Sequence, residues 1–220
     1  DNLPISLLAQ KKYSEIIVIR LVQRGLKKRE RNLAANVTLI KPGESLGSLF
    51  DFTKERAGVN IELGYYDAMK VFKGYHGIKY CIEVKQDEEY FLKRLLQIDR
   101  AKLEGVHKGL GVPDGMPYSR FILEYLAPLL AELLPVTKNA SYRDLTLALL
   151  ERAADKAGIE RFRVHRYDEF ERRVIKSYRP QGIKISLPTF LKGNELLLKV
   201  KKKQLLDDIT DALVWGIKQG

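Results

Sequence analysis

The stretch EIIVIRLV, residues 15–22, is an almost unbroken run of β-branched and aliphatic side chains. A strand with one face in water would alternate polar and apolar residues, and this run lacks that alternation. Such a run is typical of a strand that is covered on both faces in a parallel sheet. The sequence therefore predicts an α/β fold built around this segment.

A second strand is predicted at NVTLI, residues 36–40, after the polar connection QRGLKKRERNLAA, and a third at KYCIEV, residues 79–84. Two strands alone do not make a stable sheet. The sheet predicted from this chain is therefore incomplete. We expect residues 1–85 to supply the C-terminal remnant of a parallel α/β sheet, followed by a mainly helical region over residues 86–220.

Helices are predicted from caps and from apolar residues at three- and four-residue spacing. Asn2 and Pro4 indicate a short helix that ends near Tyr13, and Thr53 caps a longer one. Further helices are expected over residues 88–105, 120–134 (bent or broken at Pro128), 141–158 (with Ser141 and Asp144 at its start), 167–178 and 201–218.

The composition indicates a basic globular protein. The formal charge is +11, which favours anionic partners such as nucleic acid or acidic lipid. One cysteine, Cys81, cannot form an intrachain disulfide and is expected to be buried. No apolar run approaches the ~20 residues of a membrane span. A cytoplasmic protein with peripheral membrane contact fits these features.

GESLG, residues 43–47, matches the G-x-S-x-G signature of serine hydrolases. A nucleophile elbow requires a sharp turn directly between a strand and a helix, whereas the helix caps Asp51 and Thr53 lie well beyond Ser45. The preferred interpretation is a turn. A self-contained hydrolase that pairs Ser45 with Asp114 remains an alternative.

Other chemistry has little support in the sequence. His76, His107 and His165 are scattered, and no cluster has the spacing of metal ligands. No glycine-rich phosphate loop is present. We therefore expect no metal and no cofactor.

The segments DNLPISLLAQKKYSEIIVIRL and IKPGESLGSLFDFTKERAGVNIELGYYDAMKVFKGYHGIKY together resemble the bacterial patatin-like phospholipases, in the part that follows their catalytic Asp. SRFILEYLAPLLAELL and GIERFRVHRYDEF are similar to the C-terminal extension of a Firmicutes-type branch of that family. The resemblance covers nearly the whole chain and is most specific over residues 1–73. The ordered series of segments carries it, since no short motif does.

The resemblance implies a Ser-Asp dyad, a glycine-rich oxyanion loop and an Asp-Gly-Gly motif, all upstream of Asp1. The segment Asp1-Asn2-Leu3-Pro4 matches one that follows Asp-Gly-Gly in this branch. Asp1, Asn2 and Pro4 are therefore expected beside the active site, and no catalytic residue lies within the chain. The implied activity is hydrolysis of phospholipids or other acyl lipids, with this chain inactive by itself.

The beginning of the chain, DNLPISLLAQ, lacks an initiator Met and a signal-peptide pattern. We expect a C-terminal fragment, made by proteolysis or by design, that either keeps the N-terminal part of the same protein as its partner or self-associates. Without such a partner, the strand at residues 15–22 would lack a neighbouring strand.

Two basic segments allow a non-catalytic alternative, a module that binds nucleic acid or anionic membranes. The first contains Arg24, Lys27, Lys28, Arg29 and Arg31, and is better explained as a solvated loop. The second is KVKKKQ, residues 199–204, in a terminal helix where Trp215 could lie at a bilayer interface. We favour a helix packed on the domain, and no specific nucleic-acid partner.

Overall fold

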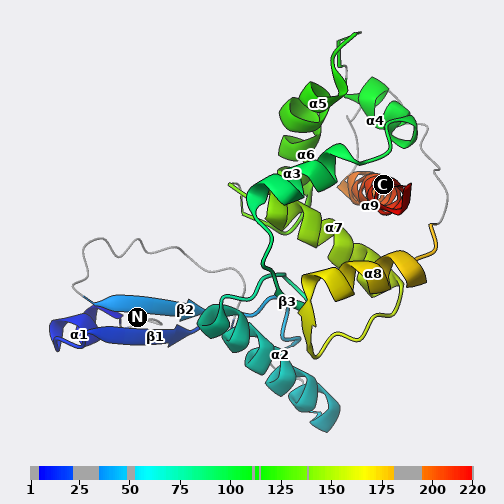
Figure 1. Cartoon of the computed structure of the whole chain (residues 1–220). Helices are drawn as coiled ribbons and strands as arrows, with labels where there is room; N and C mark the ends of the chain where they lie inside the picture. The colour runs from blue at the N-terminus through cyan, green and yellow to red at the C-terminus, as the bar shows by residue number, and fades with distance from the viewer. Residues whose placement is uncertain are drawn as a thin grey trace. The chain divides into compact units, whose positions relative to one another are not determined.

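A computed structural model describes residues 5–21, 35–48, 53–110, 112–113, 115–137, 139–180 and 195–219 (Figure 1). The chain is a mixed α/β protein in which helices predominate. It divides into two compact units. The first comprises Asp1–Glu83 and Arg161–Val164, and the second comprises Val84–Glu160 and His165–Gly220. The sequence predicted a single boundary after residue 85, and it did not predict that Arg161–Val164 belongs to the first unit.

The first unit contains α1 (Ile5–Gln10), β1 (Glu15–Ile19), β2 (Asn36–Ile40), α2 (Lys54–Lys73) and β3 (Cys81–Glu83). β1 and β2 are parallel, with Glu15 opposite Asn36 and Ile19 opposite Ile40. Both predicted strands are confirmed, although β1 ends at Ile19 and not at residue 22. The Arg20 amide still donates to the Ile40 carbonyl at 2.9 Å, so the pairing extends one hydrogen bond past the strand.

The β1–β2 sheet carries apolar side chains on both of its faces. Residues opposite each other in a parallel pair point to the same face, so Ile16 and Val18 share a face with Val37 and Leu39. Ile17 and Ile19 point to the other face. Exposure differs along each face: Ile16, Val18 and Ile40 are buried, whereas Ile17 (58%), Ile19 (67%), Val37 (37%) and Leu39 (43%) are open to solvent. This is the composition of strands from the interior of a larger sheet.

α2 is capped as predicted. The Thr53 side chain accepts a hydrogen bond from the Arg56 amide, and Gly74 adopts the left-handed conformation that ends the helix. Only Leu63 and Asp67 of α2 are buried. Of the fourteen large apolar residues described as exposed, every one except Trp215 lies in the first unit. Exposed apolar surface is therefore concentrated in this unit.

β3 corresponds to the strand predicted at residues 79–84 and is shorter. It forms a second two-stranded sheet with β4 (Val164–Arg166), whose first residue belongs to the first unit. An isolated antiparallel bridge also joins His76 to Ile82, with hydrogen bonds in both directions at 2.8 and 2.9 Å.

The second unit is helical and is organised around its last helix (Figure 1). α9 (Glu195–Gln219) contacts α3 (Glu88–Leu96), α6 (Ala127–Leu133), α7 (Tyr142–Lys156) and α8 (Tyr167–Ser177). Its Ile209, Ala212, Leu213 and Val214 are fully buried. The expectation that the terminal helix packs on its domain is confirmed.

The prediction of a single helix over residues 88–105 is wrong. α3 ends at Leu96, and the chain continues through a 3-10 turn, η1 (Ala101–Leu103), into α4 (Glu104–Gly109). Two hydrogen bonds mark the break. The Asp99 amide donates to the Ala212 carbonyl of α9 at 3.3 Å, which is a tertiary contact, and the Asp99 carboxylate accepts from the Lys102 amide at 3.1 Å, which is a local cap of the next turn. The backbone here bonds outside its own helix, so the helix cannot continue.

The segment around Pro128 is interrupted as predicted. α5 (Tyr118–Phe121) passes into a π-helical turn, η2 (Ile122–Leu126), before α6 begins with Pro128 in its first turn. Proline tolerates a first turn because its missing N–H would have no partner there. The predicted capping box of α7 is also confirmed, since Ser141 and Asp144 cap each other's backbone amides and Gly158 follows the helix with φ of 66°.

Candidate functional site

The loop that contains the G-x-S-x-G match lies in the first unit, between β2 and α2. Ser45 is exposed, and its Oγ accepts a hydrogen bond from the Gly47 amide at 3.3 Å. β2 ends at Ile40 and α2 begins at Lys54, so Ser45 is not on a turn that joins a strand directly to a helix. The geometry of a nucleophile elbow is therefore absent around this serine.

Side chains of α2 fix the loop by its carbonyl groups. Arg56 donates from Nη2 to the Ser45 carbonyl at 2.7 Å and from Nε to the Leu46 carbonyl at 2.8 Å. The Asn60 amide group donates to the same Leu46 carbonyl at 3.0 Å. Both carbonyl groups thus accept hydrogen bonds from the planar, charged guanidinium of Arg56, which holds this part of the loop against the first turns of the helix.

A buried ion pair fixes the start of the loop. The Gly43 amide donates to Asp67 Oδ2 at 2.9 Å, and Asp67 Oδ1 lies 2.7 Å from Lys70 Nζ. Lys70 also donates to the Ile78 carbonyl at 2.8 Å. The amides of Gly43 and Gly47 are therefore donated within the protein and do not point to a place where an oxyanion would form.

Residues 161–164, which belong to the first unit, hold the loop at a third point. Arg161 Nη1 lies 2.7 Å from Glu44 Oε1, and Arg161 Nε donates to the Lys79 carbonyl at 3.0 Å. Tyr66 of α2 donates to the Phe162 carbonyl at 2.7 Å and stacks on the Phe162 ring. These residues were not identified from the sequence, because polar residues far apart in the chain carry no periodic signal of their contact.

Each of the three histidines has a structural contact within its own unit. His107 contacts the ring of Phe121, with centroids 5.0 Å apart. His165 is buried, with its Nε2 2.9 Å from the Glu160 carbonyl, and His76 bridges to Ile82 through its backbone. Asp114, the alternative partner of Ser45, lies outside the described residues.

Cys81 is buried as expected. Burial raises the pKa of its thiol to about 11, Lys70 opposes that rise and Asp67 adds to it. At neutral pH the group is a thiol and not a thiolate, so it is not an activated nucleophile. No group of three or more potential metal ligands occurs among the residues that the structure covers.

The expected active-site neighbours Asp1, Asn2 and Pro4 lie outside the described residues. So do the basic residues Arg24, Lys27, Lys28, Arg29 and Arg31. In the second basic segment, Lys202 and Lys203 are exposed on α9. Trp215 is 39% exposed, and Lys102 Nζ lies 4.7 Å from its ring centroid. No described helix is long and apolar enough to cross a membrane.

No family model, curated protein or solved structure matches the chain.

Gly43 provides a direct test of how the loop is held. A Cβ at this position would lie 2.3 Å from the Ile78 carbonyl oxygen and 3.1 Å from Asp67 Oδ1. We expect Gly43→Ala to lower the free energy of unfolding by about 1–3 kcal/mol, as overpacking does, whereas Ser45→Ala should change it by less than about 0.5 kcal/mol. Urea unfolding of both variants measures the difference. Equal stabilities would contradict the role given to the buried pair.

Proposed function

We propose that this chain is the C-terminal portion of a patatin-like lipid acyl hydrolase whose Ser-Asp dyad lies upstream of Asp1. The observation that carries the proposal is the β1–β2 sheet. Its two parallel strands are apolar on both faces, yet Ile17 and Ile19 are more than half exposed. Interior strands of a parallel sheet have this composition, and the resemblance implies a parallel sheet whose other strands come earlier in the protein.

The chemistry proposed for the whole protein is acyl transfer through a covalent intermediate. The upstream serine attacks the ester carbonyl of a phospholipid or related acyl lipid, and the alcohol portion leaves. Water then hydrolyses the acyl-enzyme and releases the fatty acid. The described loop supports a serine elsewhere, because Ser45 is bonded within its own loop and the nearby glycine amides are already donated.

The partners of this chain follow from the same proposal. They are the acyl lipid substrate, the surface of the membrane that contains it, and the N-terminal part of the same protein. The last of these would cover the open faces of β1–β2, where burial of apolar surface is worth ~25 cal/mol per Å². The position proposed for Asp1, Asn2 and Pro4 is beside the active site of the completed protein.

Ser45→Ala tests the assignment in the full-length protein. We expect hydrolysis of a fluorogenic phospholipid to keep its rate, because this side chain takes no part in catalysis. A rate lower by several orders of magnitude, with the fold preserved by circular dichroism, would overturn the assignment. Labelling of Ser45 in the 220-residue chain by a fluorophosphonate probe would instead support the self-contained hydrolase.

The coding sequence upstream of Asp1, read together with an intact mass, tests the proposal at its source. We expect an Asp-Gly-Gly motif a few residues before Asp1 and a G-x-S-x-G elbow earlier in the frame. A frame without Asp-Gly-Gly would end the proposal. Salt-dependent DNA binding by the chain would then favour the basic binding module.

A further inference from the structure

The outer side of α2 carries a regular apolar stripe. Ile61, Tyr65, Ala68 and Phe72 recur at intervals of four, three and four residues, which places them on one side of the helix. Ile61 is 73% exposed, Tyr65 58% and Phe72 57%. The opposite side contains Leu63 and Asp67, the two buried residues of the helix. An apolar helix face of this kind is normally covered by protein.

We propose that two copies of this chain associate through the α2 stripe, with the two helices antiparallel about a twofold axis. This inference is independent of the proposed enzymatic function. A contact of this kind is isologous, so the same patch must be complementary to itself. The spacing of the stripe is that of the contact positions in paired helices.

The sizes of the stripe residues are self-complementary in the antiparallel arrangement. An axis midway between positions 65 and 68 sets Tyr65 against Ala68 of the second copy. It sets Ile61 against Phe72 of the second copy. The largest central side chain thus faces the smallest one, which is how large and small residues interdigitate in a packed helix pair.

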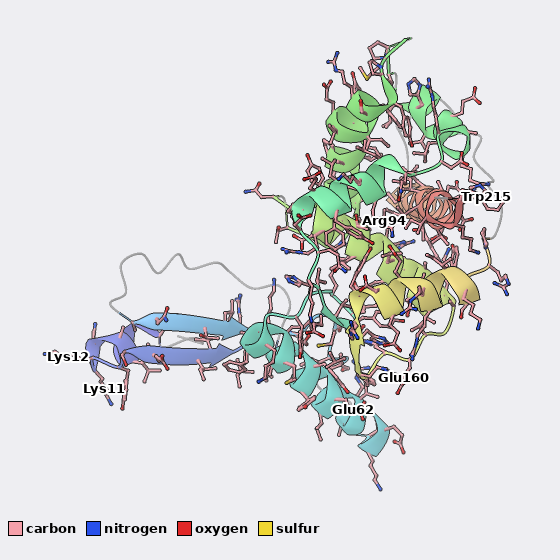
Figure 2. The ribbon with its side chains drawn as sticks, in the orientation of Figure 1. Lys11, Lys12, Glu62, Arg94, Glu160 and Trp215 are labelled. Carbon is pink, nitrogen blue, oxygen red and sulfur yellow. The ribbon has the colours of Figure 1, made fainter. Side chains whose placement is uncertain are left out.

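The flanks of the stripe favour the same orientation. One flank carries the exposed Glu62 and, nearer the C-terminal end, the exposed Lys73, and Figure 2 shows Glu62 on α2. The other flank carries Gly64 and Val71 and no charge. In the antiparallel pair, the twofold axis brings each flank against the same flank of the second copy. The acidic part of the charged flank in one copy therefore meets the basic part of that flank in the other copy. A parallel pair would set Glu62 against the uncharged flank.

The contact involves one helix from each copy, so we expect a reversible dimer whose population depends on concentration. Sedimentation velocity of the 220-residue chain over a concentration series measures it. Phe72→Glu should raise the dimer dissociation constant by about tenfold or more, because a charge would be buried in the contact. Ile17→Glu is the matched control, since Ile17 on β1 is 58% exposed in the same unit.

A charge exchange tests the orientation. Glu62→Lys should weaken the dimer, and addition of Lys73→Glu in the same chain should restore it. Circular dichroism of each variant separates loss of association from loss of fold. A monomer at every concentration, association that survives Phe72→Glu, association that Ile17→Glu abolishes, or a double variant weaker than Glu62→Lys would each overturn the proposal.

Discussion

Gly216→Ala is expected to destabilise the helical unit strongly. A Cβ at Gly216 would lie 1.8 Å from the Gln97 carbonyl oxygen and 2.8 Å from its carbon. Both are backbone atoms, so no side chain can rotate to make room. One turn earlier, Ala212 accepts a hydrogen bond from the Asp99 amide. The added methyl therefore forces α9 away from the turn after α3 and strains that bond.

We expect the free energy of unfolding to fall by about 3 kcal/mol or more, at the upper end of the cost of overpacking. That is a large part of the 5–15 kcal/mol that typically stabilises a protein. Gly64→Ala is the control, since a Cβ there meets nothing within 4 Å. It should stabilise the first unit by about 0.5–1 kcal/mol, because alanine favours a helix over glycine. Urea unfolding followed by circular dichroism compares the two, and similar effects would contradict the close approach.

Arg94→Ala is the second substitution that we expect to lower the free energy of unfolding strongly. Arg94 of α3, labelled in Figure 2, donates from Nη2 to Glu171 Oε2 of α8 at 2.8 Å. The Glu171 side chain is 7% exposed. Tyr167 donates to the other carboxylate oxygen at 2.6 Å, and Arg94 Nε donates to the Tyr90 hydroxyl at 3.0 Å. Burial lowers the pKa of the guanidinium, but Glu171 and Tyr90 more than offset this and hold it above its ordinary value.

Removing Arg94 leaves a buried carboxylate without its cation, which typically costs about 3–5 kcal/mol. Replacing both members of the pair, Arg94→Met with Glu171→Leu, should restore much of that loss, since no charge is then left buried. Arg120→Ala serves as a matched control, because Arg120 pairs with Glu124 at 2.8 Å in solvent and should matter little. A single variant as stable as the double one would contradict the cost assigned to the uncompensated carboxylate.

Local patterns predicted the elements whose ends are determined by nearby residues. The strand at 36–40, the Thr53 cap and the Ser141–Asp144 capping box are examples, because each depends on residues within a few positions in the chain. The break after Leu96 was not predictable in this way. It depends in part on a backbone contact between Asp99 and Ala212, and nothing in EEYFLKRLLQIDRAKLEG indicates that contact.

The candidate loop shows the same limit. The distance from Ser45 to the helix cap correctly predicted a turn and not an elbow, since it is a local feature. The residues that hold the loop, Arg56, Asp67 and Arg161, came only from the structure. The sequence suggests an exposed helix position for Asp67, whereas in the structure Asp67 is 6% exposed and accepts a hydrogen bond from the Gly43 amide.

The return of Arg161–Val164 to the first unit has a practical consequence for dissecting the protein. The backbone crosses from one unit to the other three times, after residues 83, 160 and 164. No single cut can therefore yield the first unit whole: a polypeptide that stops at residue 85 would lack the guanidinium bonded to Glu44 and the ring stacked on Tyr66. A minimal version of the first unit must therefore also supply residues 161–164.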